Sequence, residues 1–130
     1  MIEQTELVVN VWNYNPPSKP IPPGELTSTV TLDVMKKRAA DKKGIACRFT
    51  CQFIFEGEII LEYVAGDTYV IDLPDVIDRN ELHTMINNSF AKFSAALEIR
   101  KLGTVLQDKA LLPFDEKRYV LEPVLAMLRD

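Results

Sequence analysis

Between residues 45 and 55 the sequence alternates strictly in side-chain character, and this pattern constrains the fold more than any other feature. Successive side chains of a β-strand point to opposite faces, so such alternation predicts a strand with one buried face. A sheet must therefore form the base of the fold. The inward side chains are expected to be Ile45, Cys47, Phe49, Cys51, Phe53 and Phe55.

Three further segments have strand character: residues 6–14, 26–34 and 59–64. The last is expected to continue to 69–71 after a kink at Gly66 and Asp67. Residues 16–24 hold five of the eight prolines and predict an extended surface connection. Charged residues 36–44 predict a hairpin loop, and residues 56–58 a tight turn. Residues 6–72 should thus form a four-stranded antiparallel meander sheet.

After residue 77 the apolar period changes to that of a helix. Asp78 and Glu81 have capping-box spacing, Ile77 and Leu82 are placed as a hydrophobic staple, and Gly103 is a natural stop. A helix over 79–102 would be about 36 Å long. We expect it to exceed one strand and to extend past the sheet or meet another subunit. The apolar stripe contains Leu82, Met85, Ile86, Phe93, Ala96 and Leu97.

The remaining tail predicts a short final helix that begins near Pro123. The fold class is therefore α+β, in a single domain over residues 1–130. A length of 130 residues is close to the commonest size of one domain with one hydrophobic core.

Composition excludes several classes of protein. The net charge of -4 gives no support to general nucleic-acid binding, and no segment has the roughly 18 consecutive apolar residues of a membrane helix. Residues 1–6 lack the features of a secretory signal, so we expect a cytoplasmic protein without membrane insertion. Cys47 and Cys51 would lie about 13 Å apart along one strand, too far for a mutual disulfide, and free buried thiols agree with a reducing compartment.

Catalytic motifs are absent from the sequence. The one histidine, His83, is expected on the exposed side of the helix without a nucleophile to activate. The glycines are scattered, so there is no phosphate loop, and no His, Cys, Asp and Glu set has metal-ligand spacing. We therefore expect a non-enzymatic protein without cofactor or metal. A small enzyme or ligand-binding domain with a pocket between helix and sheet is the alternative left open.

Two charged segments stand out. Residues 56–81 contain eight acidic residues and one arginine. Glu56, Glu58 and Glu62 are candidates for an acidic docking surface for a basic or metal-carrying protein partner, with Glu58 and Glu62 on one strand face. A solvated sheet face is the plainer explanation. The basic residues within 36–43 also have two possible roles. They either protect a sheet edge from aggregation or bind an anionic partner.

Apolar side chains outside the periodic segments form a third group of candidates. They include Trp12, Tyr14, Tyr69 and Phe114. Either the core wraps around the edges of the sheet to include them, or some of them line an exposed groove or a subunit interface.

The order of elements resembles the SecB-type protein-export chaperones. The residues that carry the resemblance are Leu26–Val34, the alternating strand 45–55, its partner 59–65, Thr68–Leu73 and the apolar segment Leu111–Asp115. The resemblance covers most of the chain and rests on pattern and order.

The resemblance implies a cytoplasmic homo-oligomer, a dimer or tetramer, that holds unfolded or extended polypeptide in apolar grooves without nucleotide. It makes Trp12, Tyr14, Tyr69 and Phe114 candidate polypeptide-binding residues, and Glu56, Glu58 and Glu62 candidate docking residues. A cytosolic interaction or regulatory protein of the same fold, which uses the acidic face without chaperone activity, is the alternative.

Overall fold

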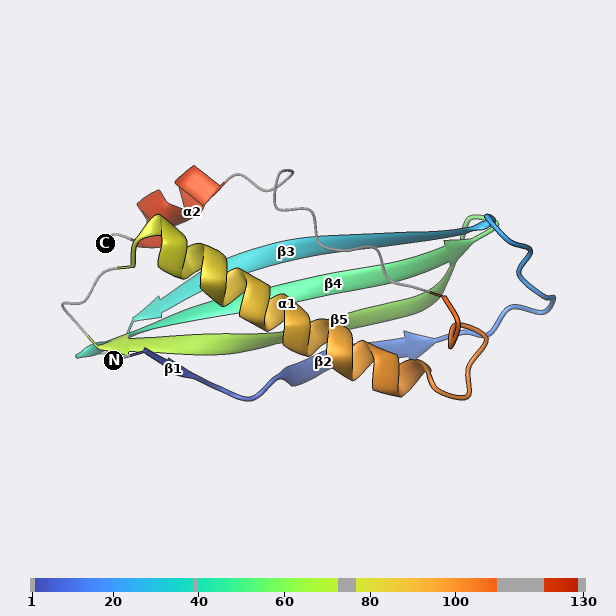
Figure 1. Cartoon of the computed structure of the whole chain (residues 1–130), viewed down its shortest axis with the longest axis horizontal. Coiled ribbons are helices and arrows are strands. Elements are labelled where there is room, and N and C mark those ends of the chain that lie inside the picture. Colours follow the sequence, from blue (N-terminus) through green and yellow to red (C-terminus); the bar gives the residue numbers. More distant parts are fainter. Residues whose placement is uncertain (1, 39, 73–76, 110–120, 129–130) are drawn as a thin grey trace.

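A computed structural model describes residues 2–38, 40–72, 77–109 and 121–128, and it shows an antiparallel sheet with a long helix across one face (Figure 1). The fold is thus α+β, as the sequence predicts. The strands are β1 (Ile2–Gln4), β2 (Val8–Tyr14), β3 (Leu26–Arg38), β4 (Lys42–Phe55) and β5 (Glu58–Asp72), and the helices are α1 (Arg79–Lys101) and α2 (Leu121–Leu128).

The central strand β4 follows the alternation of its sequence. Every second residue from Lys43 to Phe55 is buried, and those between are half-buried on the other face. The inner face of β4 and β5 lies under α1, which crosses the strands diagonally (Figure 1). No described helix lies on the outer face, which is the arrangement that antiparallel sheets tolerate.

The start of α1 has the predicted capping box. The Asp78 side chain accepts a hydrogen bond from the Glu81 backbone N–H at 2.8 Å, and the Glu81 side chain accepts one from the Asp78 N–H. Ile77 and Leu82 are both buried, as expected of a staple. At the other end Gly103 has a φ of 80°, which favours glycine and stops the helix.

The predicted count of four strands and the meander order are wrong for the N-terminal segment. This segment forms two strands, β1 and β2, and both pair with β5, so the order is β1 or β2, then β5, β4 and β3. Strands β2 to β5 therefore have a Greek-key order. Residues 15–25 cross the end of the sheet, a distance of about 14 Å that they span easily.

The strand irregularities lie elsewhere than predicted. Strand β5 continues without interruption through Gly66 and Asp67, whereas the register with β4 shifts at Ile60. The expected loop over 36–44 is only a short turn, because β3 extends to Arg38 and β4 begins at Lys42. Each extra paired residue satisfies backbone groups that a loop would leave to solvent.

Helix α1 does not exceed the strands. Its 23 residues make it about 35 Å long, whereas the 14 residues of β4 extend about 46 Å. The expectation that α1 is longer than one strand is wrong because the strands are longer than predicted. The short helix α2 contacts α1 and β3, with Leu125 buried at this contact region and Val124 packed against the core.

Candidate functional site

Exposed apolar side chains gather where α1 ends. Ile99, Leu102 and Val105 have exposed fractions of 71%, 63% and 49%. Ile99 and Leu102 are three residues apart and share a helix face. The Val105 N–H donates to the Tyr14 hydroxyl at 3.3 Å, which brings this region against β2. We call the exposed Ile99, Leu102 and Val105, with Tyr14, which contacts Val105, and Trp12, which contacts Arg100, the α1-end patch.

Trp12 connects this patch to the core through a series of aromatic contacts. Its ring meets Tyr63 edge-on at 5.7 Å between centroids, and Tyr63 stacks on Phe93 at 4.5 Å. Above it, the Arg100 guanidinium lies 5.5 Å from the Trp12 centroid, within cation–π range. Trp12 is half-buried: Tyr63 and Arg100 cover part of its ring, and the rest is exposed. Burial raises the pKa of Tyr63 to about 12, so its hydroxyl stays protonated and donates to the Phe93 carbonyl at 3.3 Å.

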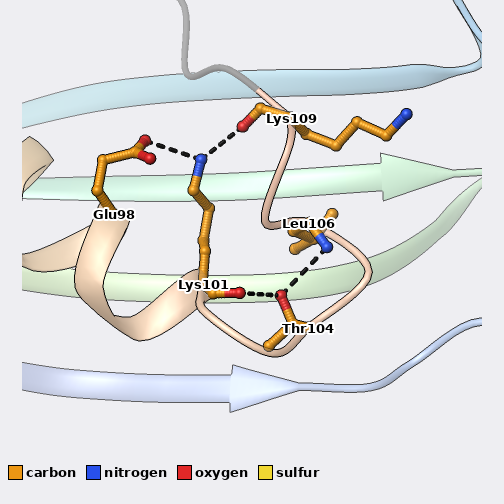
Figure 2. A network of polar contacts seen from close by, with 5 residues as sticks. All are labelled: Glu98, Lys101, Thr104, Leu106 and Lys109. Carbon is orange, nitrogen blue, oxygen red and sulfur yellow. Dashed lines mark hydrogen bonds and ion pairs between the residues drawn. The ribbon is translucent and has the colours of Figure 1, made fainter.

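A polar network holds the chain turn that carries Leu102 and Val105 (Figure 2). The fully buried Lys101 ammonium binds the Glu98 carboxylate at 2.8 Å and donates to the Lys109 carbonyl at 2.5 Å. The Thr104 hydroxyl donates to the Lys101 carbonyl at 2.7 Å and accepts from the N–H of the buried Leu106. Leu102 and Val105 are therefore presented on a turn that polar contacts hold in place.

The structure divides the four predicted polypeptide-binding residues. Trp12 and Tyr14 lie together on the inward side of β2, next to the end of α1. Tyr69 is only 4% exposed and donates its hydroxyl to the Met85 carbonyl at 3.1 Å, so it belongs to the core beneath α1. Phe114 lies outside the described residues. Of the two explanations left open, inclusion in the core describes Tyr69, and Trp12 and Tyr14 are partly buried against the same core.

The three predicted docking carboxylates do not share one face. Glu56 lies in the β4–β5 turn and forms an ion pair with Lys19 at 2.7 Å. Glu62 is on the outer face, where it accepts from Gln52 at 2.8 Å. Glu58 pairs with Phe55, whose side chain points inward. The prediction that Glu58 and Glu62 point the same way is wrong because the bulge at Ile60 reverses the alternation between them.

A buried polar cluster, which the sequence reasoning missed, lies midway under α1. Asp67 is 4% exposed, and its carboxylate accepts from the Ser89 hydroxyl at 2.5 Å and from the Gln4 amide at 2.6 Å. Cys47 is the direct partner of Asp67 on β4. Burial, with a contribution from Asp67, raises the pKa of Cys47 to about 12. A protonated thiol is a poor nucleophile, so Cys47 is not an activated group. The hydrogen bonds of Asp67 join β1, β5 and α1.

Position in the repeating pattern could have revealed these polar residues. Ser89 and Lys101 continue the spacing of the buried stripe of α1, and Asp67 has the inward parity of β5. The predicted stripe did not include Ser89 and Lys101 because it was defined by apolar residues alone.

Metal-ligand clusters and membrane-spanning helices are both absent from the described part of the chain. In ranges 2–38, 40–72, 77–109 and 121–128, no group of three or more His, Cys, Asp and Glu side chains is placed to hold a metal ion. Among the described helices, none combines the length and apolar character needed to cross a membrane. No model of a known protein family and no curated protein matches the chain.

Proposed function

We propose that this protein is a non-enzymatic polypeptide-binding protein, a SecB-like chaperone that holds unfolded or extended chains at the α1-end patch. The observation that carries the proposal is the display of Ile99 in the last turn of α1, and of Leu102 and Val105 on a chain turn fixed by part-buried polar contacts. Exposed apolar side chains that form a group are typical of protein-interaction sites. The half-buried Trp12 beside them offers an aromatic surface for a client side chain.

The order of elements supports a SecB-like fold. Two short strands, a proline-containing connection, three antiparallel strands, a long helix and a short helix follow one another, and apart from the extra strand β1 this is the order on which the resemblance rests. We therefore also propose a cytoplasmic homo-oligomer, with the sheet edge at β3 as support. In the described sheet β3 pairs only with β4, so one edge of this 13-residue strand has no described strand beside it.

The experiment that tests the function is suppression of light scattering from a reduced, unfolding model protein, without nucleotide. We expect the wild-type chain to suppress aggregation near stoichiometric amounts, and the double variant Ile99→Ser, Leu102→Ser to lose most of this effect. The matched control is Val8→Ser, because Val8 is 58% exposed and lies on the outer face of the sheet. Absence of suppression at several-fold excess of wild type, or equal suppression by the double variant, contradicts the proposal.

A further inference from the structure

Arg100 provides a positive charge at the border of the α1-end patch. It is exposed, and its guanidinium lies over Trp12 at 5.5 Å from the ring centroid. The neighbouring Lys101 is paired with Glu98, but no carboxylate among the described residues forms an ion pair with Arg100. Its capacity to bind an anion is therefore unused within the described part of the chain.

The contact with Trp12 prepares Arg100 for a carboxylate. A guanidinium that lies over an aromatic face keeps its N–H bonds in the plane of the group, where they remain able to donate. A carboxylate accepts two of these bonds in parallel. The ring also limits the orientations of the guanidinium, so less conformational freedom is lost when an anion binds.

Long-range attraction does not favour an acidic ligand, because the chain has a net charge of -4. A preference for acidic segments must therefore come from the local geometry of Arg100. Such a preference would distinguish this patch from a surface that binds any apolar chain.

Resting on the polypeptide-binding function proposed above, we propose that the α1-end patch selects extended segments in which an Asp or Glu side chain neighbours apolar residues. The apolar side chains pack on Ile99, Leu102 and the open part of Trp12, and the acidic side chain binds Arg100. Arg100 is thus a specificity-determining residue, and the partner is an apolar, acid-bearing polypeptide.

Fluorescently labelled peptides with blocked termini test this inference by anisotropy. Three peptides share the same apolar residues and differ at one position, which is Glu, Gln or Lys. For wild type we expect the Glu peptide to bind about three- to tenfold more tightly than the Gln peptide, and the Lys peptide to bind most weakly. The difference should shrink in high salt because the ion pair is near the surface. Trp12 is the only tryptophan, so its emission reports independently whether the peptides occupy the patch.

Arg100→Gln should bind the Glu and Gln peptides equally, with the affinity for the Gln peptide within about twofold of wild type. Arg100→Lys should recover part of the preference, since it restores the charge without the planar group. Arg79→Gln, at the opposite end of α1, is the control and should keep the full preference. Near-ultraviolet circular dichroism confirms that each variant is folded.

The outcomes separate the two proposals. If the peptides bind but wild type does not distinguish Glu from Gln, or Arg100→Gln keeps the preference, the inference fails and the polypeptide-binding function stands. If a free C-terminal carboxylate replaces Glu with equal effect and the Glu side chain gives none, the patch recognises chain ends and the inference is wrong. If no peptide binds, both proposals fail.

Discussion

At the residue scale, Gly66 is the glycine with the least room for a side chain. A Cβ atom there would lie 2.5 Å from the Cys47 carbonyl oxygen and 2.8 Å from the Arg48 Cα. Both are backbone atoms of β4, so relief requires movement of a central strand. Strand β5 can therefore approach β4 this closely only with a glycine at this position.

We predict that Gly66→Ala lowers the free energy of unfolding by about 1–3 kcal/mol, the usual cost of overpacking. Urea denaturation measures the change. Gly44→Ala is the control on the same outer face, because its Cβ would make an ordinary contact at 3.5 Å with the Thr68 methyl group. Equal destabilisation by both variants would mean that general loss of glycine, and not the close approach, is the cause.

The thiols of Cys47 and Cys51 should be unreactive in the native protein. Both are free and fully buried, and burial raises the pKa of each to about 12. At pH 8 almost no thiolate exists in the fold. We predict that a thiol-specific disulfide reagent modifies them only as fast as the chain unfolds, whereas in denaturant modification is complete within the mixing time. Rapid modification of the native protein would contradict this placement.

Alternation along a strand could identify buried residues only where they are apolar. The inward set of β4 is predicted correctly because a strand with one buried face admits only one parity. Tyr69 has the same parity in β5, but its polar hydroxyl also fits an exposed groove, and only the bond to Met85 decides between them. Trp12 and Arg100 lie far apart in sequence, so their contact depends on the tertiary fold and has no local signal.

At the scale of elements, the N-terminus of α1 depends on its capping box. We predict that Asp78→Ala lowers the free energy of unfolding by about 1 kcal/mol, because the Glu81 N–H loses its acceptor. Thermal or urea unfolding measures the change. Asn80→Ala is the control, since Asn80 is exposed in the same turn and should change stability by less than about 0.5 kcal/mol. A neutral Asp78→Ala would show that the sheet contacts alone fix where α1 begins.

Element boundaries that have a local sequence signal were predictable, whereas the pairing between strands was less predictable. The boundaries of α1 follow from Asp78, Glu81 and Gly103, and the β4–β5 turn follows from Glu56 and Gly57, which both have positive φ. The pairing of β2 with β5 was missed because chain proximity favoured β3 as its partner. The bulge at Ile60 was missed because both of its neighbours are apolar and hide the change of parity.

At the scale of the whole molecule, stability should decrease in alkaline solution. Burial raises the pKa of Cys47, Cys51 and Tyr63 to about 12 and also raises that of Tyr69. The ordinary pKa is 9.0 for a thiol and 10.0 for a phenol, so the unfolded chain releases these protons first. The contribution to stability is therefore complete below about pH 9 and is lost as the pH rises toward 12.

We predict a falling free energy of unfolding between pH 9 and 12, measured by urea denaturation at each pH. The double variant Cys47→Ala, Cys51→Ala should have a shallower slope, by up to about 1.4 kcal/mol per pH unit for each thiol removed. Its stability at pH 7 gives the baseline, which separates the loss of packing from the loss of the titrating groups. An unchanged alkaline slope would mean that the thiols are accessible in the native state.

The contact of Gln4 with Asp67 also matters for anyone who shortens this chain. Strand β1 has only 3 residues, and its pairing with β5 looks expendable. Its last residue, Gln4, however, supplies one of two donors to the carboxylate of Asp67, a residue that is 4% exposed beneath α1. Trimming the first four residues would remove the Gln4 donor and leave the Asp67 side chain with the Ser89 hydroxyl, which would weaken the packing of α1 on the sheet. A small N-terminal deletion is thus a change to the interior of the protein.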